Sequence, residues 1–387
     1  MPAPEADREA LQAAVHEAAA GLVGREALVE LVVLAAVAGE HLLVVGAPGT
    51  GKSAAVRQVA RALGGRFFEY LLGRFSEPAE LFGPVDLRRL REGELVVETT
   101  GMLPEADLAF LDELFLGSTA ILNTLLSVLN EGRFRRGRTD LNVPLRLCVA
   151  ACNELPQEPA LAALSDRFLV RVFIQPLPDA RLEELLAAVE PAGAHGRPDR
   201  RDAVDRLGAL DALRAAARAV DLGDVRGVYA EAVRSLRTGG ISLSDRRVVR
   251  AQRLVAAAAA LAGRDAANEQ DLWPLLFAVP TEGEQSRARD LLPALLAPSS
   301  HRLLAHAVNA ASDGPGALAS RLVAEAAVLP ASLTASPDRA RALGWLRDVD
   351  VAFHPDDLPA PLAAARAAIL TRMNAEEAGA PPAPRPG

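Results

Sequence analysis

One segment, Gly46 to Ser53, has the residue types and spacing of a loop that binds phosphate. It reads Gly-Ala-Pro-Gly-Thr-Gly-Lys-Ser and matches the pattern G-x-x-x-x-G-K-[ST]. Its Lys52 is the single lysine of the chain, because the other 41 of the 42 basic residues are arginines. A compact ammonium on a flexible stem fits between the β- and γ-phosphates of a nucleotide, whereas a planar guanidinium is too wide. The segment therefore predicts binding of a nucleoside triphosphate.

The residues on either side predict the strand, loop and helix that such a site requires. His41 to Val45 is a short apolar run typical of a buried parallel strand, and Ser53 to Leu63 is helical in character. The positive amino end of this helix faces the anion, and the Ser53 hydroxyl is suited to Mg²⁺. The predicted nucleotide-binding residues of the loop are Gly46, Ala47, Pro48, Gly49, Thr50, Gly51, Lys52, Ser53 and Ala54.

Two carboxylates follow a second apolar run, Leu108 to Leu111. We expect Asp112 to hold magnesium, often through water, and Glu113 to polarise the water that attacks the γ-phosphate. The alternative is that both acids only favour the amino end of a helix. Their place at the end of an apolar strand, downstream of a phosphate loop, favours the catalytic interpretation.

A third predicted strand, Leu145 to Cys152, ends at Asn153. The carboxyl ends of parallel strands border the crevice where α/β sheets bind ligands, so the Asn153 amide could orient the same water. Alternatively, Asn153 caps the turn that continues into residues 154–156.

The composition argues against several other classes of protein. The formal net charge is −8 and no basic tract reaches five residues, so nucleic acid is not expected as the main partner. The arginines within 133–138 most simply form a solvated or subunit-facing loop, with a nucleic-acid contact as the alternative. No apolar stretch has the length of a membrane span, and the start lacks a signal-peptide pattern. Two lone cysteines, Cys148 and Cys152, suit a reducing cytoplasm.

Together these motifs resemble the AAA+ ATPases, most closely the MoxR family and its RavA-like members. The resemblance is dense from Leu22 to Val172, weaker to Leu292 and faint beyond. Besides the motifs above, it is carried by residues 23–26, 73–84, 101–106, 120–126, 130–134, 151–156 and 165–168. Longer RavA-like chains carry a further β-rich domain, which we expect to be absent here because only residues 299–387 follow the lid.

The resemblance implies roles for three polar residues outside the phosphate loop. Asn153 would be the residue called sensor 1. Arg167 would be an arginine finger that reaches the nucleotide of the neighbouring subunit, although it could instead only neutralise the carboxyl end of a helix. Arg246 would be sensor 2, with the adjacent Arg247 as an alternative register.

The resemblance also implies an adenine contact and an inserted hairpin. Val23 and Gly24 would lie against the adenine. The segment from Phe82 to Leu103 would contain the helix-2 insert, which points into the central channel of a ring. Within it, Arg91 to Val97 fits a β-hairpin with a glycine turn.

The predicted fold is α/β: a P-loop AAA+ core of three layers with a parallel sheet and the insert hairpin, followed by helical parts. The expected divisions are an amphipathic N-terminal helix (1–20), the nucleotide-binding core (21–200), an all-α lid (201–298), a C-terminal helical domain (299–374) and a disordered tail (375–387).

We therefore expect a ring, most simply a hexamer, that hydrolyses ATP with Mg²⁺. As the resemblance implies, it would remodel an unknown protein client in the cytoplasm together with a von Willebrand factor A-domain partner. A nucleotide-gated scaffold with little hydrolysis is one alternative, against which Glu113 argues. A small-molecule kinase is another, and it explains Lys52 but not Asp112 and Glu113.

Overall fold

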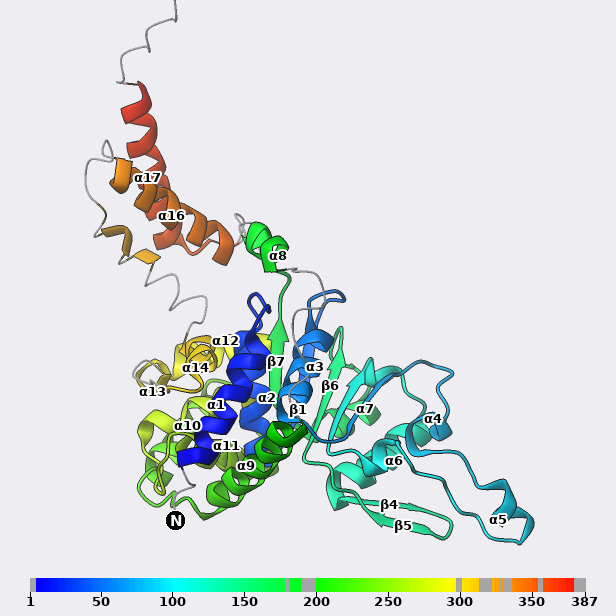
Figure 1. The fold of residues 1–387 in the computed structure, drawn as a ribbon. Coiled ribbons are helices and arrows are strands. Elements are labelled where there is room, and N and C mark those ends of the chain that lie inside the picture. Colours follow the sequence, from blue (N-terminus) through cyan, green and yellow to red (C-terminus); the bar gives the residue numbers. More distant parts are fainter. Residues whose placement is uncertain are drawn as a thin grey trace, which may run out of the picture. The chain divides into compact units, whose positions relative to one another are not determined.

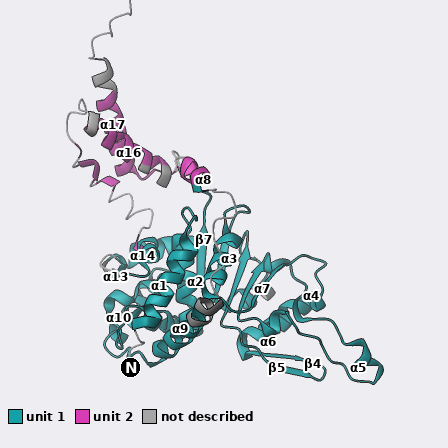
Figure 2. Cartoon of the chain, in the orientation of Figure 1, with its two compact units in different colours: residues 1–176, 188–311 teal, residues 177–187, 312–387 magenta. Residues whose placement is uncertain are grey.

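The computed structural model describes residues 5–177, 181–188, 200–296, 301–312, 322–323, 325–327, 329, 336–353 and 358–378. They belong to two compact units (Figure 2). The first unit comprises residues 1–176 and 188–311, and the second comprises 177–187 and 312–387. All residues of the predicted nucleotide site lie in the first unit.

A five-stranded parallel sheet forms the centre of the first unit (Figure 1). Its strand order is β2-β3-β6-β1-β7, so the strand that leads into the phosphate loop lies between β6 and β7. The order is not sequential, and each crossover therefore needs a helix on one face of the sheet. The strands are β1 (His41–Gly46), β2 (Phe67–Leu71), β3 (Leu108–Asp112), β6 (Leu147–Cys152) and β7 (Phe168–Ile174).

Alternate side chains of these strands enter two separate cores. Leu42 and Val44 pack on one face of the sheet, and Leu43 and Val45 pack on the other. Helices α1 (Glu5–Ala19), α2 (Glu26–Ala38), α3 (Lys52–Leu63) and α9 (Arg200–Ala219) contribute to the first core. Helices α4 (Pro78–Phe82), α6 (Thr119–Glu131) and α7 (Pro159–Ser165) contribute to the second. These three layers confirm the predicted fold class.

The parallel register gives the sheet two chemically different edges. Gly46, at the end of β1, pairs with Ile174, and Leu71 pairs with Asp112. At the opposite edge, His41 pairs with Phe168. We call the side of the sheet where the parallel strands end the carboxyl edge, and the side where they begin the amino edge. The phosphate loop and the predicted catalytic carboxylates follow strands at the carboxyl edge, whereas Arg167 precedes a strand at the amino edge.

The insert within 82–103 differs in part from the predicted β-hairpin. Its outgoing arm is a short helix, α5 (Leu87–Arg91), because Asp86 accepts hydrogen bonds from the backbone N–H groups of Arg88 and Arg89. The turn does fall at Gly93, whose φ is 84°. At its base the insert closes through a single antiparallel bridge, Val85 to Val97. A two-stranded hairpin, β4 (Arg133–Arg136) and β5 (Thr139–Asn142), lies alongside it (Figure 1).

The lid packs against the amino edge of the sheet. Its helices are α10 (Arg226–Thr238), α11 (Asp245–Leu261), α12 (Glu282–Leu291), α13 (Pro293–Leu296) and α14 (Ala305–Ser312), with 3₁₀ turns at Glu269–Asp271 and Trp273–Ala278. Ser244 caps α11 by accepting from the N–H of Arg247. The buried Arg247 guanidinium then donates to the carbonyls of Leu169 (2.6 Å) and Ala278 (2.9 Å) and to Asp166 (3.0 Å). Arg247 therefore joins α11, β7 and the segment around Arg167.

A buried carboxylate makes a second connection between the sheet and the lid. Glu40, fully buried just before β1, accepts from Arg250 and from Arg253 (3.0 Å) of α11. A buried carboxylate needs such partners, because leaving its charge unpaired away from water costs several kcal/mol. These two connections fix the position of α11, and hence of Arg246, relative to β1.

The second unit is helical and brings together two distant parts of the chain. It contains α8 (Leu182–Ala188), α16 (Ser336–Ala352) and α17 (Ala360–Ala378). Trp345 anchors it by donating its indole N–H to the carbonyl of Leu322 (2.8 Å). Helix α17 includes residues 375–378 of the predicted tail, and 379–387 lie outside the described residues. Within the described ranges, no helix combines the length and apolar character needed to cross a bilayer.

Two neighbouring arginines of α11 give a matched test of how the lid is held. We expect Arg247→Ala to lower the free energy of unfolding by about 3 kcal/mol, because it leaves Asp166 and two carbonyls without their donor. Arg246 is exposed, so Arg246→Ala should change the free energy of unfolding by no more than about 0.5 kcal/mol. Urea unfolding without nucleotide measures both. Equal losses in the two variants would contradict the assignment of Arg247 as the lid anchor.

Candidate nucleotide-hydrolysis site

The phosphate loop connects β1 to the amino end of α3. Gly49 and Gly51 have φ values of 78° and 80°, a left-handed backbone that a residue with a Cβ rarely adopts. Lys52 is only 6% exposed, and its ammonium donates to the carbonyls of Gly46 (2.6 Å) and Ala47 (2.9 Å). The positive charge is therefore held within the loop, next to the helix amino end that attracts an anion.

Ser53 and Asp112 form the part of the site suited to a metal ion. The Ser53 hydroxyl donates to Asp112 Oδ2 at 3.2 Å, although the two residues are 59 positions apart. A hydroxyl and a carboxylate are the hard oxygen ligands that Mg²⁺ prefers in proteins, usually together with phosphate oxygens and waters. The donor set present therefore fits magnesium bound with a nucleotide.

Glu113 is held in an unusual backbone conformation. Its φ is 50°, the one positive value at a non-glycine position among the described residues. Such strain costs of order 1–3 kcal/mol and is found most often at functional sites. The Glu113 N–H donates to Asp112 Oδ1 (3.0 Å), and the Asn153 amide donates to Glu113 Oε1 (2.6 Å). Both bonds help to hold the carboxylate at the carboxyl edge, where sequence reasoning placed it.

Arg25 is a site residue to which sequence reasoning gave no role. It is largely buried, and it donates to the carbonyls of Gly24 (2.6 Å), Thr50 (2.6 Å) and Gln175 (2.9 Å). It thus fixes the segment expected to contact the adenine against the phosphate loop and the end of β7. Its presence within the motif at 23–26 was visible in the sequence, but its three partners are set by the tertiary fold.

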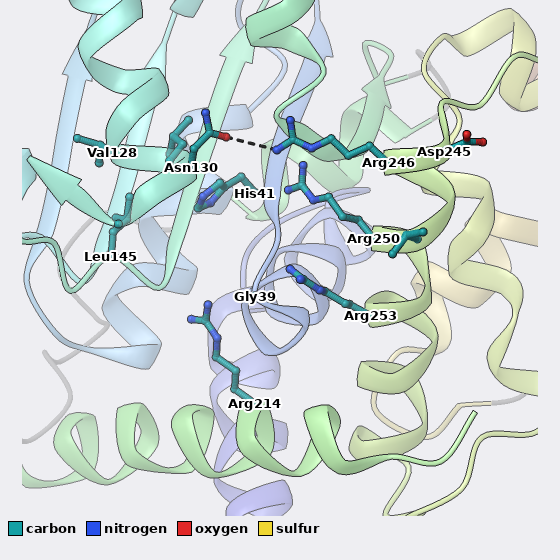
Figure 3. Close-up of a pocket in the computed structure, with 13 residues that line it drawn as sticks. Gly39, His41, Val128, Asn130, Leu145, Arg214, Asp245, Arg246, Arg250 and Arg253 are labelled. Atoms are coloured by element: carbon teal, nitrogen blue, oxygen red, sulfur yellow. Dashed lines mark hydrogen bonds between the residues drawn. The ribbon is translucent and has the colours of Figure 1, made fainter. Parts of the chain in front are cut away.

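The remaining two predicted residues, Arg167 and Arg246, do not join this group. Arg167 lies just before β7, at the amino edge. Arg246 donates to Asn130 at 3.3 Å, at the end of α6 (Figure 3). The two lie near each other, because Arg250, one helical turn beyond Arg246, donates to the Arg167 carbonyl (3.2 Å). Neither arginine therefore reaches the phosphate loop of its own chain.

Arg246 lines a pocket of about 710 Å³ at the amino edge, where α11 faces the start of β1 (Figure 3). Four arginines border the pocket: Arg214, Arg246, Arg250 and Arg253. The acidic groups beside them are Asp245, which lines the pocket, the buried Glu40, which pairs with Arg250 and Arg253, and Asp211, whose charge acts on Arg214. His41 adds no charge at neutral pH, because desolvation and the positive Arg250 lower its pKa to about 4. The pocket is therefore positively charged and suited to an anion.

The structure thus divides the predicted site into two groups. Lys52, Ser53, Asp112, Glu113 and Asn153 come together at the carboxyl edge, and Arg167 and Arg246 lie at the amino edge. Because Arg247 is fully engaged in the lid, Arg246 is the residue of that pair left at the surface. The individual roles, including the adenine contact of Val23 and Gly24, stay predictions.

The fold and the site define a P-loop ATPase of the AAA+ class, and comparison with known proteins gives its family. A family model described as the MoxR domain in the MoxR-vWA-beta-propeller ternary systems matches residues 9–210. A second, an AAA lid domain, matches residues 223–288. The chain belongs to the MoxR family of AAA+ ATPases.

Individual relatives are also similar to the chain. An uncharacterised protein of Methanocaldococcus jannaschii is 34% identical over 63% of this chain and 64% of its own length. Chaperone MoxR1 of Mycobacterium tuberculosis is 27% identical over 46% of this chain and 48% of its own length. The chain spans just under two thirds of the length of its first archaeal relatives.

The fold has a counterpart among solved structures. A crystal structure of a proposed ATPase from Cytophaga hutchinsonii matches with a TM-score of 0.59 at 17% identity. The match covers 76% of this chain and 96% of that one. At this identity the similarity establishes the fold alone.

Replacing the predicted base tests the chemistry of the carboxyl edge. Glu113→Gln keeps the shape of the side chain and an oxygen that can accept from Asn153, but it removes the proton acceptor. We expect ATP to bind with near-normal affinity and hydrolysis to fall by ~10²-fold or more. Binding of a fluorescent ATP analogue and release of phosphate measure the two effects. Unchanged hydrolysis would mean that another group activates the water.

Proposed function

We propose that the chain hydrolyses ATP with Mg²⁺ in a ring of identical subunits. The observation that carries this proposal is the division of the site between two opposite edges of one sheet. One edge supplies a phosphate loop, a metal site and a base, and the other supplies arginines. A complete site then forms only where the carboxyl edge of one subunit meets the amino edge of the next, as in a head-to-tail ring.

At the carboxyl edge, each side chain has a task that follows from its position. Lys52 turns from the loop carbonyls to the β- and γ-phosphates. Ser53 and Asp112 hold the magnesium ion, which when bound neutralises phosphate charge. Glu113 takes the proton of the attacking water, and Asn153 keeps the Glu113 carboxylate oriented. Val23 and Gly24 contact the adenine, and Arg25 holds that segment in place.

At the amino edge, Arg167 and Arg246 act on the nucleotide of the neighbouring subunit. Charge develops on the γ-phosphoryl oxygens in the transition state, and Lys52 with magnesium neutralises it only in part. An arginine supplied from outside stabilises that charge. The basic pocket lined by Arg246 supports this role, because a triphosphate is the anion that the neighbour presents. We propose a hexamer as the ring.

We further propose that the ATPase remodels a protein client together with a von Willebrand factor A-domain partner. The name of the matching family model, which refers to MoxR-vWA systems, supports the partner. The chaperone name of the mycobacterial relative supports the remodelling activity. The resemblance of the motifs at 73–84 and 151–156 supports a place near the RavA-like members. The two buried, free cysteines are consistent with work in a reducing cytoplasm.

Mixing two inactive variants tests whether the site is shared between subunits. Arg167→Ala chains should bind ATP normally but hydrolyse it slower by a factor on the order of 10³, judging from other arginine fingers. Lys52→Ala chains should not bind ATP. A mixture should regain activity, because some junctions combine an intact phosphate loop with an intact finger. Phosphate release from each variant and from mixtures measures this.

The matched control is a mixture of Lys52→Ala with the double variant Lys52→Ala/Arg167→Ala, in which no junction has an intact loop. Activity should also rise more steeply than linearly with protein concentration. Linear activity at the lowest concentrations, with no recovery on mixing, would mean that each chain hydrolyses ATP alone.

A further inference from the structure

A second pocket adjoins the one that Arg246 lines. It has a volume of about 510 Å³ and lies between α9 and α11, at the end of α2. We call it the α9–α11 pocket. The two pockets share a wall that consists of Gly39, Arg214, Val249 and Arg253. Neither Arg167 nor Arg246 lines the second pocket, so the nucleotide chemistry proposed above leaves it unassigned.

The lining of the α9–α11 pocket is basic. Its polar members are Arg214, Arg218, Gln252 and Arg253, and none of the described residues that line it is acidic. The acids beside it are Glu40, Asp211, Asp221 and Asp224. Two of them also serve other arginines, because Glu40 pairs with Arg250 and Asp211 pairs with Arg146. The surface of the pocket therefore keeps a net positive charge.

Two of these arginines repel each other. Arg214 and Arg218 are four positions apart on α9 and are therefore neighbours on the helix surface, where like charges are destabilising. Burial lowers the pKa of Arg214, and the positive charge of Arg218 lowers it further. The backbone also approaches this guanidinium closely, since a Cβ on Gly39 would lie 2.8 Å from Arg214 Nη2. An anion bound between the two arginines removes their repulsion.

The same arginines have hydrogen-bond donors without acceptors. Among the described residues, the Arg214 guanidinium makes one hydrogen bond, from Nη1 to the carbonyl of Arg146 at 3.3 Å, and its buried Nε has no acceptor. Arg218 is exposed and has no hydrogen bond or ion pair with the described part of the chain. Arg214 and Arg253 point toward Gly39 from two helices (Figure 3). Guanidinium groups that converge in this way bind phosphate through charge-assisted hydrogen bonds.

The rest of the lining is apolar and consists of Ala38, Ala217, Val220, Leu222, Val249 and Ala256. Val249 is 65% exposed on the surface of α11. An inorganic anion leaves this apolar surface in contact with water, whereas a ligand with a ring or an alkyl group covers it. A few polar groups beside apolar walls, in a space of this size, are typical of sites for small molecules.

We propose that the α9–α11 pocket binds a small organic phosphate. The phosphate contacts Arg214, Arg218 and Arg253, and the organic group covers the apolar wall around Val249. The bound ligand connects α9 to α11, the helix whose first turn carries Arg246. This site is separate from the proposed nucleotide site and does not depend on the proposed ring. An acidic polypeptide is a poorer match, because a carboxylate carries one negative charge and a phosphate carries nearly two.

Calorimetric titration with phenyl phosphate tests the proposal. The starting chain is the full-length Lys52→Ala variant, whose phosphate loop has lost its cation. Phenyl phosphate should bind ~10-fold or more tightly than inorganic phosphate, because its ring covers the apolar wall. Arg218→Gln, added to the starting chain, should weaken phenyl phosphate by ~10-fold or more. Two controls should each change the affinity by less than about 2-fold: Arg234→Gln, on an exposed part of α10, and Arg246→Gln, in the adjoining pocket only.

Thermal unfolding of the same chains gives an independent measure. Phenyl phosphate at ten times its Kd should raise the Tm of the starting chain by about 3 °C. The same concentration should raise the Tm of the chain that also carries Arg218→Gln by less than about 1 °C. Without the probe, Arg218→Gln should not lower the Tm, because the change removes a repulsion and no hydrogen bond.

Three results would overturn the proposal. One is equal affinity of the starting chain and its Arg218→Gln variant for phenyl phosphate. Another is equal affinity for phenyl phosphate and inorganic phosphate, which would indicate an adventitious ion only. The third is tighter binding of a peptide of glutamate and leucine than of phenyl phosphate. With Lys52 intact and no probe, Arg218→Gln should hydrolyse ATP at the wild-type rate, and a wild-type chain without ATPase activity would overturn the proposed function but not this site.

Discussion

The separation between the two edges of the sheet is the constraint on which the rest of the structure depends. Strand β1 has six residues, so the Cα atoms at its two ends lie about 17 Å apart. Lys52 follows one end, and the arginine pocket surrounds the other. No side chain spans that distance, and therefore the arginines cannot complete the site of their own chain. The buried contacts of Glu40 and Arg247 hold the arginines at the amino edge. A shared site is the simplest consequence of this geometry.

The carboxyl edge, by contrast, is organised in advance. Asn153 already holds Glu113, and Arg25 already joins three segments around the loop. The positive φ of Glu113 costs energy that the surrounding contacts must offset. Preorganised groups need little rearrangement when charge develops on the phosphate, which is where enzymes gain most of their rate. In the proposed ring, the chain thus has half of its site in place before a neighbour arrives.

Much of this could be predicted from the sequence, and the failures have physical reasons. The phosphate loop and the Asp112-Glu113 pair were predictable because local spacing alone sets them on strand ends. The choice between Arg246 and Arg247 was not, because it depends on which side of α11 faces the carbonyls of Leu169 and Ala278. The helical arm of the insert was also missed, since the predicted hairpin covered only Arg91 to Val97 and the Asp86 cap that starts α5 lies before it. Contacts made across the fold leave little trace in local sequence.

Cross-linking across the junction tests the central claim most directly. Glu154→Cys places a thiol at the carboxyl edge, and Arg246→Cys places one at the amino edge. Native Cys148 and Cys152 should interfere little, because burial raises the pKa of both thiols to about 12. Chains that carry one substitution each are mixed with ATP and Mg²⁺ under mild oxidation. We predict a disulfide-linked dimer that contains one chain of each kind and depends on ATP. Absence of that mixed dimer, in preparations that still hydrolyse ATP, would contradict a site shared between subunits.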